Sequence, residues 1–126
     1  MKLRIHQNSL RLRLNRSDLK QFRQTGVCTE ALRFAQNSEL SYALEASSQV
    51  TAMEAQLREG CIRILLPLTM AQEWAGSDQV SLSLSSGEGG GPSLLIEKDF
   101  QCLHGGGANP GEDADTFPNP KSAMNT

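Results

Sequence analysis

Apolar and polar side chains alternate every second residue over much of this chain. Leu3 and Ile5 are separated by one residue, as are Leu10, Leu12 and Leu14, and each of these gaps holds an arginine. Successive side chains of a strand point to opposite faces of a sheet, so we expect the leucines to face a core and the arginines to face solvent. The polar residues 6–9 predict a tight turn between these two strands.

A short helix is expected after this hairpin. Ser17 is in a position to cap its first turn, and Asp18 suits the positive end of the helix dipole. Leu19 and Phe22 share one face of such a helix, and Gly26 is expected to end it. Two further strands are expected at about 28–34 and 39–46, joined by a turn at 35–38.

The same order of elements recurs in the second half. Alternating apolar residues predict strands at about 53–57, 62–66, 80–84 and 94–96. Thr69 with Gln72 three residues later matches a capping box, which predicts a second short helix bearing Met70 and Trp74. The glycine-rich residues 87–91 are expected to form a hairpin loop.

An offset of 52 residues superimposes the two halves. It places Leu10, Leu12, Leu14, Ser17, Leu19 and Phe22 on Ile62, Ile64, Leu66, Thr69, Ala71 and Trp74. We therefore predict a mainly β protein with two short helices, built as tandem ββαββ repeats over residues 1–48 and 51–99. One repeat buries too little surface to stand alone, so both are expected to share the core of one pseudo-two-fold β-barrel, followed by an irregular acidic tail over 100–126. Chance alternation in two unrelated sheets is the alternative.

Charge is divided unevenly along the 126 residues, although the net charge is only -2. Residues 1–33 carry eight basic and two acidic side chains, whereas residues 34–126 carry four basic and twelve acidic ones. The near-neutral balance excludes a uniformly basic nucleic-acid coat protein, and 5% aromatic residues argue against a platform for stacking bases.

Membrane and export signals are not evident. No apolar run approaches the roughly 20 residues that span a bilayer, and no apolar stretch follows the basic start. The cysteines Cys28, Cys61 and Cys102 are odd in number and widely spaced, which does not suit a disulfide framework. We expect a cytoplasmic protein without a membrane partner.

Residues 62–80 resemble a transition-state-regulator (AbrB/MazE-like) swapped-hairpin unit. That family has a strand, often a proline, a short helix, a Gly-Asp-x-Val turn and two more strands. Gly76, Asp78 and Val80 stand in that turn, with Ser77 inserted, and Asn15 replaces the proline in the first half. Two such units normally come from two chains and interlock, so the resemblance implies a self-contained pseudo-dimer that binds DNA through an exposed strand face.

The whole chain also resembles an uncharacterised family of small bacterial proteins. The resemblance rests on residues 2–5 with 8–14 at the start, and on residues 97–103 with 117–120 near the end. It implies no activity.

Arg11, Arg13 and Arg16 are the candidate nucleic-acid or partner contacts. Alternate residues of a strand lie about 6–7 Å apart, a spacing that can follow a phosphate backbone, and guanidinium groups bind phosphate bidentately. The matching residues of the second half are nearly uncharged, which does not suit a pseudo-palindromic DNA reader. A solvated strand face, paired with acids of a neighbouring strand, is the alternative.

Cys102 and His104 are weak candidates for a metal site. Thiolate and imidazole both bind zinc, and acidic residues follow, but a structural site needs four ligands and no second close pair is present. Nothing in the sequence marks a catalytic cysteine–histidine pair, and residues 87–91 lack the Gly-Lys-Ser/Thr of a phosphate loop. We expect no cofactor and no enzymatic activity.

Phe117 is the only aromatic residue between 105 and 126 and is a candidate anchor on a partner or on the barrel, a mobile terminus being the alternative. The favoured function is a non-catalytic binding module for a protein or regulatory partner. A DNA- or RNA-binding regulator that uses the basic strand face is the alternative, and a metal-binding protein or enzyme with a site near Cys102 and His104 is third. The oligomeric state stays open.

Overall fold

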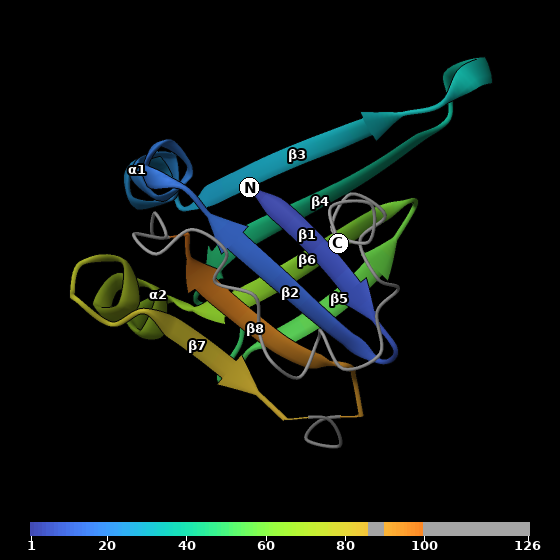
Figure 1. Cartoon of the computed structure of the whole chain (residues 1–126). Helices are drawn as coiled ribbons and strands as arrows, with labels where there is room; N and C mark the ends of the chain where they lie inside the picture. The colour runs from blue at the N-terminus through green and yellow to red at the C-terminus, as the bar shows by residue number, and fades with distance from the viewer. Residues whose placement is uncertain (86–89, 100–126) are drawn as a thin grey trace, which may run out of the picture.

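The protein is mainly β with two α-helices in the part that a computed structural model describes, residues 1–85 and 90–99 (Figure 1). The helices are α1 (Arg16–Thr25) and α2 (Leu68–Ala75), and a short 3-10 turn covers Ala35–Asn37. The strands are β1 (Lys2–His6), β2 (Ser9–Leu14), β3 (Val27–Arg33), β4 (Glu39–Ser47), β5 (Glu54–Arg58), β6 (Cys61–Pro67), β7 (Ser81–Leu84) and β8 (Ser93–Lys98). The predicted fold class and the order of elements are confirmed.

The strands form two four-stranded sheets. The first sheet has the order β1-β2-β8-β7, and the second has the order β3-β4-β6-β5. Each sheet therefore takes one hairpin from each repeat, and the two hairpins are joined by parallel pairing, β2 with β8 and β4 with β6. The repeats exchange hairpins, so neither repeat can complete a sheet without the other.

The expected closed barrel is not formed by the described residues. No ladder joins the two sheets, and β1, β7, β3 and β5 remain edge strands. The inner strands take two neighbours each, because every hairpin uses its inner strand to pair with a hairpin of the other repeat. The outer strand of each hairpin then has no second partner, so the architecture is two packed sheets.

The duplication extends to the pairing register. The backbone N–H of Ser93 donates to Asn8 at 3.0 Å, where β8 meets β2. The backbone N–H of Ser41 donates to Gly60 at 2.9 Å, where β4 meets β6. The two bonds are related by the 52-residue offset that superimposes the halves of the sequence. The repeat is therefore a feature of the backbone geometry as well as of the apolar pattern.

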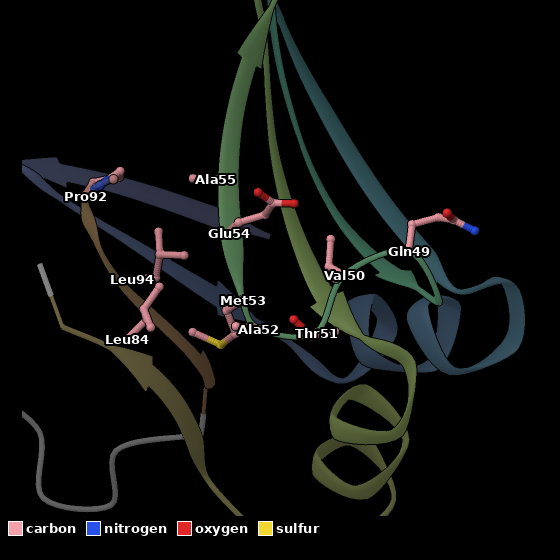
Figure 2. Close-up of a pocket in the computed structure, with 11 residues that line it drawn as sticks. Gln49, Val50, Thr51, Ala52, Met53, Glu54, Ala55, Leu84, Pro92 and Leu94 are labelled. Carbon is pink, nitrogen blue, oxygen red and sulfur yellow. The ribbon is translucent and has the colours of Figure 1, made fainter. Parts of the chain in front are cut away.

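The connection between β4 and β5 carries the chain from one repeat to the next. It brings Met53 into the interior, where this side chain is 5% exposed. Figure 2 shows Met53 beside Leu84 and Leu94, which belong to the last hairpin of the chain. This contact closes one side of the core, because Leu94 is buried and Leu84 packs against the buried cluster.

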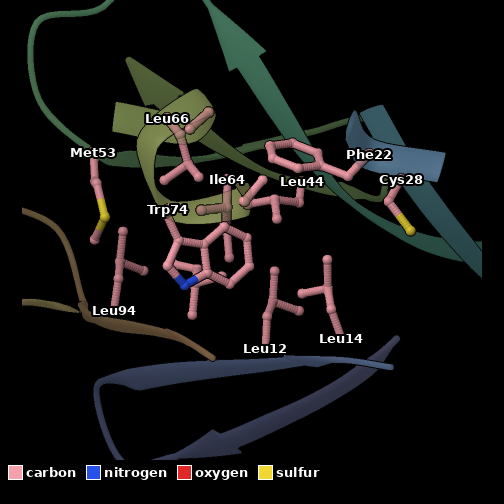
Figure 3. Close-up of a cluster of buried hydrophobic side chains, with 13 residues drawn as sticks. Leu12, Leu14, Phe22, Cys28, Leu44, Met53, Ile64, Leu66, Trp74 and Leu94 are labelled. Carbon is pink, nitrogen blue, oxygen red and sulfur yellow. The ribbon is translucent and has the colours of Figure 1, made fainter. Parts of the chain in front are cut away.

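The core lies between the two sheets and the helices (Figure 3). Its fully buried aliphatic side chains come from the inner strands of both sheets and are Leu12, Leu14, Leu44, Ile64, Leu66 and Ile96. Phe22 and Trp74, which occupy equivalent positions in the two repeats, meet edge to face with ring centroids 6.2 Å apart. The indole N–H of Trp74 donates to the backbone oxygen of Val80 at 3.2 Å, so its one polar group is satisfied.

Helix α1 begins two residues earlier than Ser17 as its N-cap would require, so the predicted cap is wrong. Asn15 is the N-cap: its Oδ1 accepts a hydrogen bond from the backbone N–H of Asp18 at 2.9 Å. The Asp18 carboxylate accepts in return from the backbone N–H of Asn15 at 3.0 Å, which completes a capping box. Gly26 ends the helix, as expected, with a left-handed φ of 80°.

The capping box predicted for the second helix is also absent. Helix α2 begins at Leu68 with Pro67 as its N-cap, and no side chain caps its first turn. Thr69 therefore lies inside the helix, where its hydroxyl is past the position from which it can cap. Proline has a φ compatible with a helix start, and it takes the place that Asn15 holds in the first repeat.

Replacing Asn15 with alanine is expected to lower the free energy of unfolding by about 1 kcal/mol, because the first turn of α1 loses its side-chain acceptor. Urea unfolding followed by far-UV circular dichroism measures this change. Ser17→Ala is the matched control and should leave stability within about 0.5 kcal/mol of wild type, as for an ordinary surface position. Equal losses from the two substitutions would contradict the assignment of Asn15 as the cap.

Candidate functional site

Arg11 and Arg13 lie on the outer face of β2, and both are ion-paired. Arg11 Nε donates to Glu97 Oε1 at 2.7 Å, and Arg13 Nε lies 2.9 Å from the same oxygen. Asp99 lies at the end of β8, where its carboxylate is 3.5 Å from both Arg13 Nη2 and Lys2 Nζ. The strand face predicted as a row of cations is therefore neutralised in large part by acids of the neighbouring strand.

The contact of Arg13 with Glu97 is electrostatic and lacks hydrogen-bond geometry. Arg13 Nε is shielded from solvent and has no aligned acceptor among the described residues, although Glu97 Oε1 is close. The Glu97 side chain is only 13% exposed, so its charge acts through little water. One partly buried carboxylate thus pairs with two arginines.

An equivalent ion pair occurs in the second repeat. Arg63 Nε donates to Glu45 Oε2 on the outer face of the second sheet, and this hydrogen bond raises the pKa of the Arg63 guanidinium. The 52-residue offset relates Arg63 to Arg11 and Glu45 to Glu97. A pair that both repeats keep at the same register indicates a role in holding β2 to β8 and β4 to β6.

Arg16 lies apart from Arg11 and Arg13, so the prediction of one continuous strand face is wrong. Strand β2 ends at Leu14, and Arg16 is the first residue of α1. With Lys20 and Arg23 it forms an exposed row along α1, here called the basic row. Spacings of four and three residues place these side chains on one face of a helix. None of the three has an ion-pair partner in the described part of the chain.

The basic row belongs to α1 alone. The corresponding positions of α2 are Leu68, Gln72 and Ala75, none of which is charged. The helical spacing of Arg16, Lys20 and Arg23 was present in the sequence as a signal. The two-residue period of β2 ends at Leu14, and the helical period of α1 begins at Arg16. Because Arg16 lies so close to this boundary, it was assigned to the strand with Arg11 and Arg13, and its spacing to Lys20 and Arg23 was overlooked.

The basic row borders two hollows at the end of the molecule where α1 and α2 lie side by side (Figure 1). A shallow hollow of about 460 Å³ lies over α1 and includes all three cations in its lining. A cleft of about 240 Å³, here called the helix cleft, lies between the helices and is lined by Phe22, Arg23, Gly26, Ala46, Leu68, Ala71, Gln72, Ala75 and Gly76. Arg23 lines both hollows, so cations stand directly beside an apolar cleft.

A further hollow of about 330 Å³ lies between the β4–β5 connection and the last hairpin (Figure 2). Among the described residues that line it, Glu54 is the only charged one. Thr51 is the one hydroxyl beside it, and no histidine, lysine or second carboxylate joins Glu54 in the described lining, so the described part of this hollow lacks the paired carboxylates or the base that acid–base or nucleophilic catalysis requires.

Partly buried charged groups surround the amino group of Met1. The Met1 ammonium lies 2.6 Å from Asp18 and 3.1 Å from Glu30, and the Tyr42 hydroxyl donates to the Met1 carbonyl at 3.0 Å. Burial lowers the pKa of the ammonium, but the hydrogen bonds that it donates to Asp18 and Glu30 and the attraction of these two carboxylates outweigh burial, so the pKa is raised. This cluster ties β1 to α1 and β3.

Cys28 is held as a thiol. Burial raises its pKa, and the nearby Asp18 carboxylate raises it further, with Sγ 3.9 Å from Asp18 Oδ1. A raised pKa lowers the thiolate fraction, so Cys28 is a poor nucleophile and serves as a core residue.

The candidate residues Cys102, His104 and Phe117 lie outside the described residues. Within residues 1–85 and 90–99, no group of three or more histidine, cysteine, aspartate or glutamate side chains is arranged to hold a metal ion. The helices in that same part of the chain are too short or too polar to cross a membrane.

Comparison with known proteins identifies a family and nothing beyond it. No curated protein and no solved structure matches the chain. The resemblance of its halves to AbrB/MazE-like swapped-hairpin units therefore stays a prediction. The resemblance to an uncharacterised family is confirmed, since the model described as "Family of unknown function (DUF7009)" matches residues 1–121, and the chain belongs to that family.

Proposed function

We propose that the protein is a non-catalytic binding module, and that α1 and the helix cleft take an acidic, amphipathic segment of a protein partner. The observation that carries the proposal is the basic row, three exposed cations without ion-pair partners in the described part of the chain, beside an apolar cleft. Both features come from one end of the molecule, so one ligand can engage them together.

The basic row and the helix cleft together suit a ligand with acidic and aliphatic side chains. Arg16 and Arg23 are separated by seven residues, which is about 10 Å along a helix axis at 1.5 Å per residue. Carboxylates spaced by one helical turn on a partner segment match that row, and cation–carboxylate pairing favours arginine because of its bidentate fork. Leu68, which is 43% exposed at the cleft, offers an apolar contact for the other side of such a segment.

A nucleic-acid regulator is the alternative function, and the charge distribution favours it less. Arg11 and Arg13 already have carboxylate partners in Glu97 and Asp99. The pseudo-two-fold equivalent of the basic row on α2 has no charge, so a two-fold duplex would meet cations on one side only. A protein segment needs only one such face.

The triple substitution R16E/K20E/R23E is expected to weaken binding of an acidic amphipathic peptide at least tenfold. The probes are fluorescent 16-residue helical peptides with glutamates on one face and leucines on the other, and the measurement is fluorescence polarisation at about 0.05 M salt. Single reversals provide the matched pair: R23E on the basic row should weaken binding, whereas R33E on β3, which removes the same charge elsewhere, should leave it unchanged. Circular dichroism confirms that each variant is folded.

A 20-base-pair DNA duplex is titrated in parallel. Duplex binding that falls steeply with salt and is lost in R16E/K20E/R23E, together with no binding of the peptides, would overturn the proposal in favour of the nucleic-acid regulator. Peptide binding that the triple substitution leaves intact would also overturn it, because the ligand would then sit elsewhere. Peptide binding that is lost with R23E and retained with R33E supports it.

A further inference from the structure

Strand β5 is an exposed edge whose sequence is complementary to itself. Within the described residues, β5 pairs with β6 only, so its other edge leaves a row of backbone N–H and C=O groups without sheet partners. Glu54, Leu57 and Arg58 are exposed. Such an edge is a template for another strand, and proteins that keep an edge open usually place a charge there to control what pairs with it.

We propose that β5 is a homodimerisation surface, which pairs antiparallel with β5 of a second copy about a two-fold axis at Gln56. In this register Glu54 of each copy lies opposite Arg58 of the other, so two ion pairs flank the axis on the outer face. Opposite charges directly across a strand pair stabilise it, and like charges destabilise it. The pairing joins the second sheets of two copies into one eight-stranded sheet with an isologous interface.

The apolar side of β5 supports the same register. Leu57 is 72% exposed, the largest exposed fraction among the large apolar residues of the described chain. Its side chain belongs to the inner face of the second sheet, and the proposed register places it opposite Ala55 of the second copy. A hollow of about 250 Å³ with Ile5 in its lining adjoins Leu57, and Ile5 is itself 60% exposed. Pairing at β5 therefore covers apolar surface that one copy leaves open.

A row of polar contacts on the outer face already leads to the proposed axis. Glu45 accepts a hydrogen bond from Arg63, and Arg63 Nη1 donates to Gln56 Oε1 at 3.4 Å. This contact uses one lone pair of the Gln56 oxygen and leaves the second lone pair and both amide N–H groups free to bond. At the axis the amide N–H of each Gln56 can donate to the oxygen of the other, so the row continues from one copy into the next without a change of register.

The other edge strands lack this complementarity. The same antiparallel pairing of β1 about its centre sets Arg4 against Arg4, and that of β3 sets Glu30 against Glu30. Strand β7 has four residues and no charged side chain to fix a register. Among the described edges, β5 alone combines opposite charges at its ends with a neutral residue at its centre. No residue of the basic row or the helix cleft takes part, so this inference does not rest on the proposed function.

Charge reversal tests the dimer directly. Sedimentation equilibrium of the full chain should show a concentration-dependent dimer. E54R and R58E should each raise the dimer dissociation constant about tenfold or more, because each sets like charges opposite one another at both ends of the pairing. The double substitution E54R/R58E restores both ion pairs and should return the constant to near that of wild type.

A mixture of the two single variants tests the proposed register most specifically. E54R supplies two arginines and R58E two glutamates, so an equimolar mixture should form a heterodimer although each variant alone is largely monomeric. E73R, which makes the same charge change on the exposed face of α2, is the matched control and should dimerise like wild type. Circular dichroism and Trp74 fluorescence verify the fold of each variant. A wild-type protein that stays monomeric at millimolar concentration, or a mixture that stays monomeric, overturns the proposal.

Discussion

Replacing Trp74 with alanine is expected to lower the free energy of unfolding by about 4 kcal/mol, the largest effect of any single substitution considered for this chain. The Trp74 side chain is 0% exposed and is the largest residue of the core. It meets Phe22 at a ring-centroid distance of 6.2 Å, and this contact joins the helices of the two repeats. Its removal leaves a cavity where sheets and helices converge, and that site has little freedom to collapse.

Urea unfolding followed by far-UV circular dichroism measures the loss. Trp74→Phe should lie between wild type and Trp74→Ala, because it keeps a ring in contact with Phe22 but loses the hydrogen bond to the Val80 carbonyl. Leu68→Ala on the same helix is the control: Leu68 is 43% exposed, and its loss should cost less than about 1 kcal/mol. If Trp74→Ala cost no more than Leu68→Ala, the packing of the two helices through Trp74 would be refuted.

The apolar alternation predicted the elements and the core well. Leu12, Leu14, Ile64 and Leu66 were expected to face the interior, and all four are buried. Period-two alternation is reliable here because a one-residue slip would turn every leucine of a strand toward solvent. The match of the two halves at an offset of 52 residues also holds in the backbone, since equivalent hydrogen bonds join β8 to β2 and β4 to β6.

The exchange of hairpins was beyond the reach of residue-level pattern analysis. Alternation tells which face of a strand is buried, but it does not tell which strand lies beside it. The parallel neighbour of β2 is β8, which lies more than 80 residues away in the sequence. The acid partners of Arg11 and Arg13 could not be found for the same reason: Glu97 becomes their neighbour only through this pairing.

The wrong N-cap predicted for the first helix and the wrong assignment of Arg16 have the same cause, which lies in residues 15–18. Ser17 and Asn15 are both good N-cap residues, and the sequence contains an acid three residues after Asn15 that completes its box. That acid distinguishes Asn15 from Ser17, and a helix that begins at Arg16 separates Arg16 from the strand. The candidate surface then follows, because Lys20 and Arg23 share the helical face of Arg16.

Removing the carboxylate of Glu97 is expected to lower the free energy of unfolding by about 2 kcal/mol, since Arg11 and Arg13 lose the acid beside their Nε atoms and a shielded polar atom left without a partner bears its desolvation cost. Glu97→Ala leaves Arg11 and Arg13 side by side on β2 without the acid that they share. Arg13 Nε is shielded from solvent, so water cannot readily replace Glu97 there. The two cations also repel one another once the intervening charge is gone.

The second repeat supplies the matched substitution. Glu45→Ala removes the equivalent acid, but Glu45 is 27% exposed where Glu97 is 13% exposed, and its partner Arg63 keeps Gln56 as a neighbour, so a smaller loss of stability is expected. The stability of Glu97→Gln, which keeps an acceptor but no charge, should fall between that of Glu97→Ala and that of wild type.

A double-mutant cycle of Glu97→Ala with Arg11→Ala separates the interaction of these two residues from other effects. A positive coupling energy that weakens in 1 M salt is the expected result. A loss for Glu45→Ala equal to that for Glu97→Ala would show that neither the second arginine nor the lower exposure of Glu97 adds to stability.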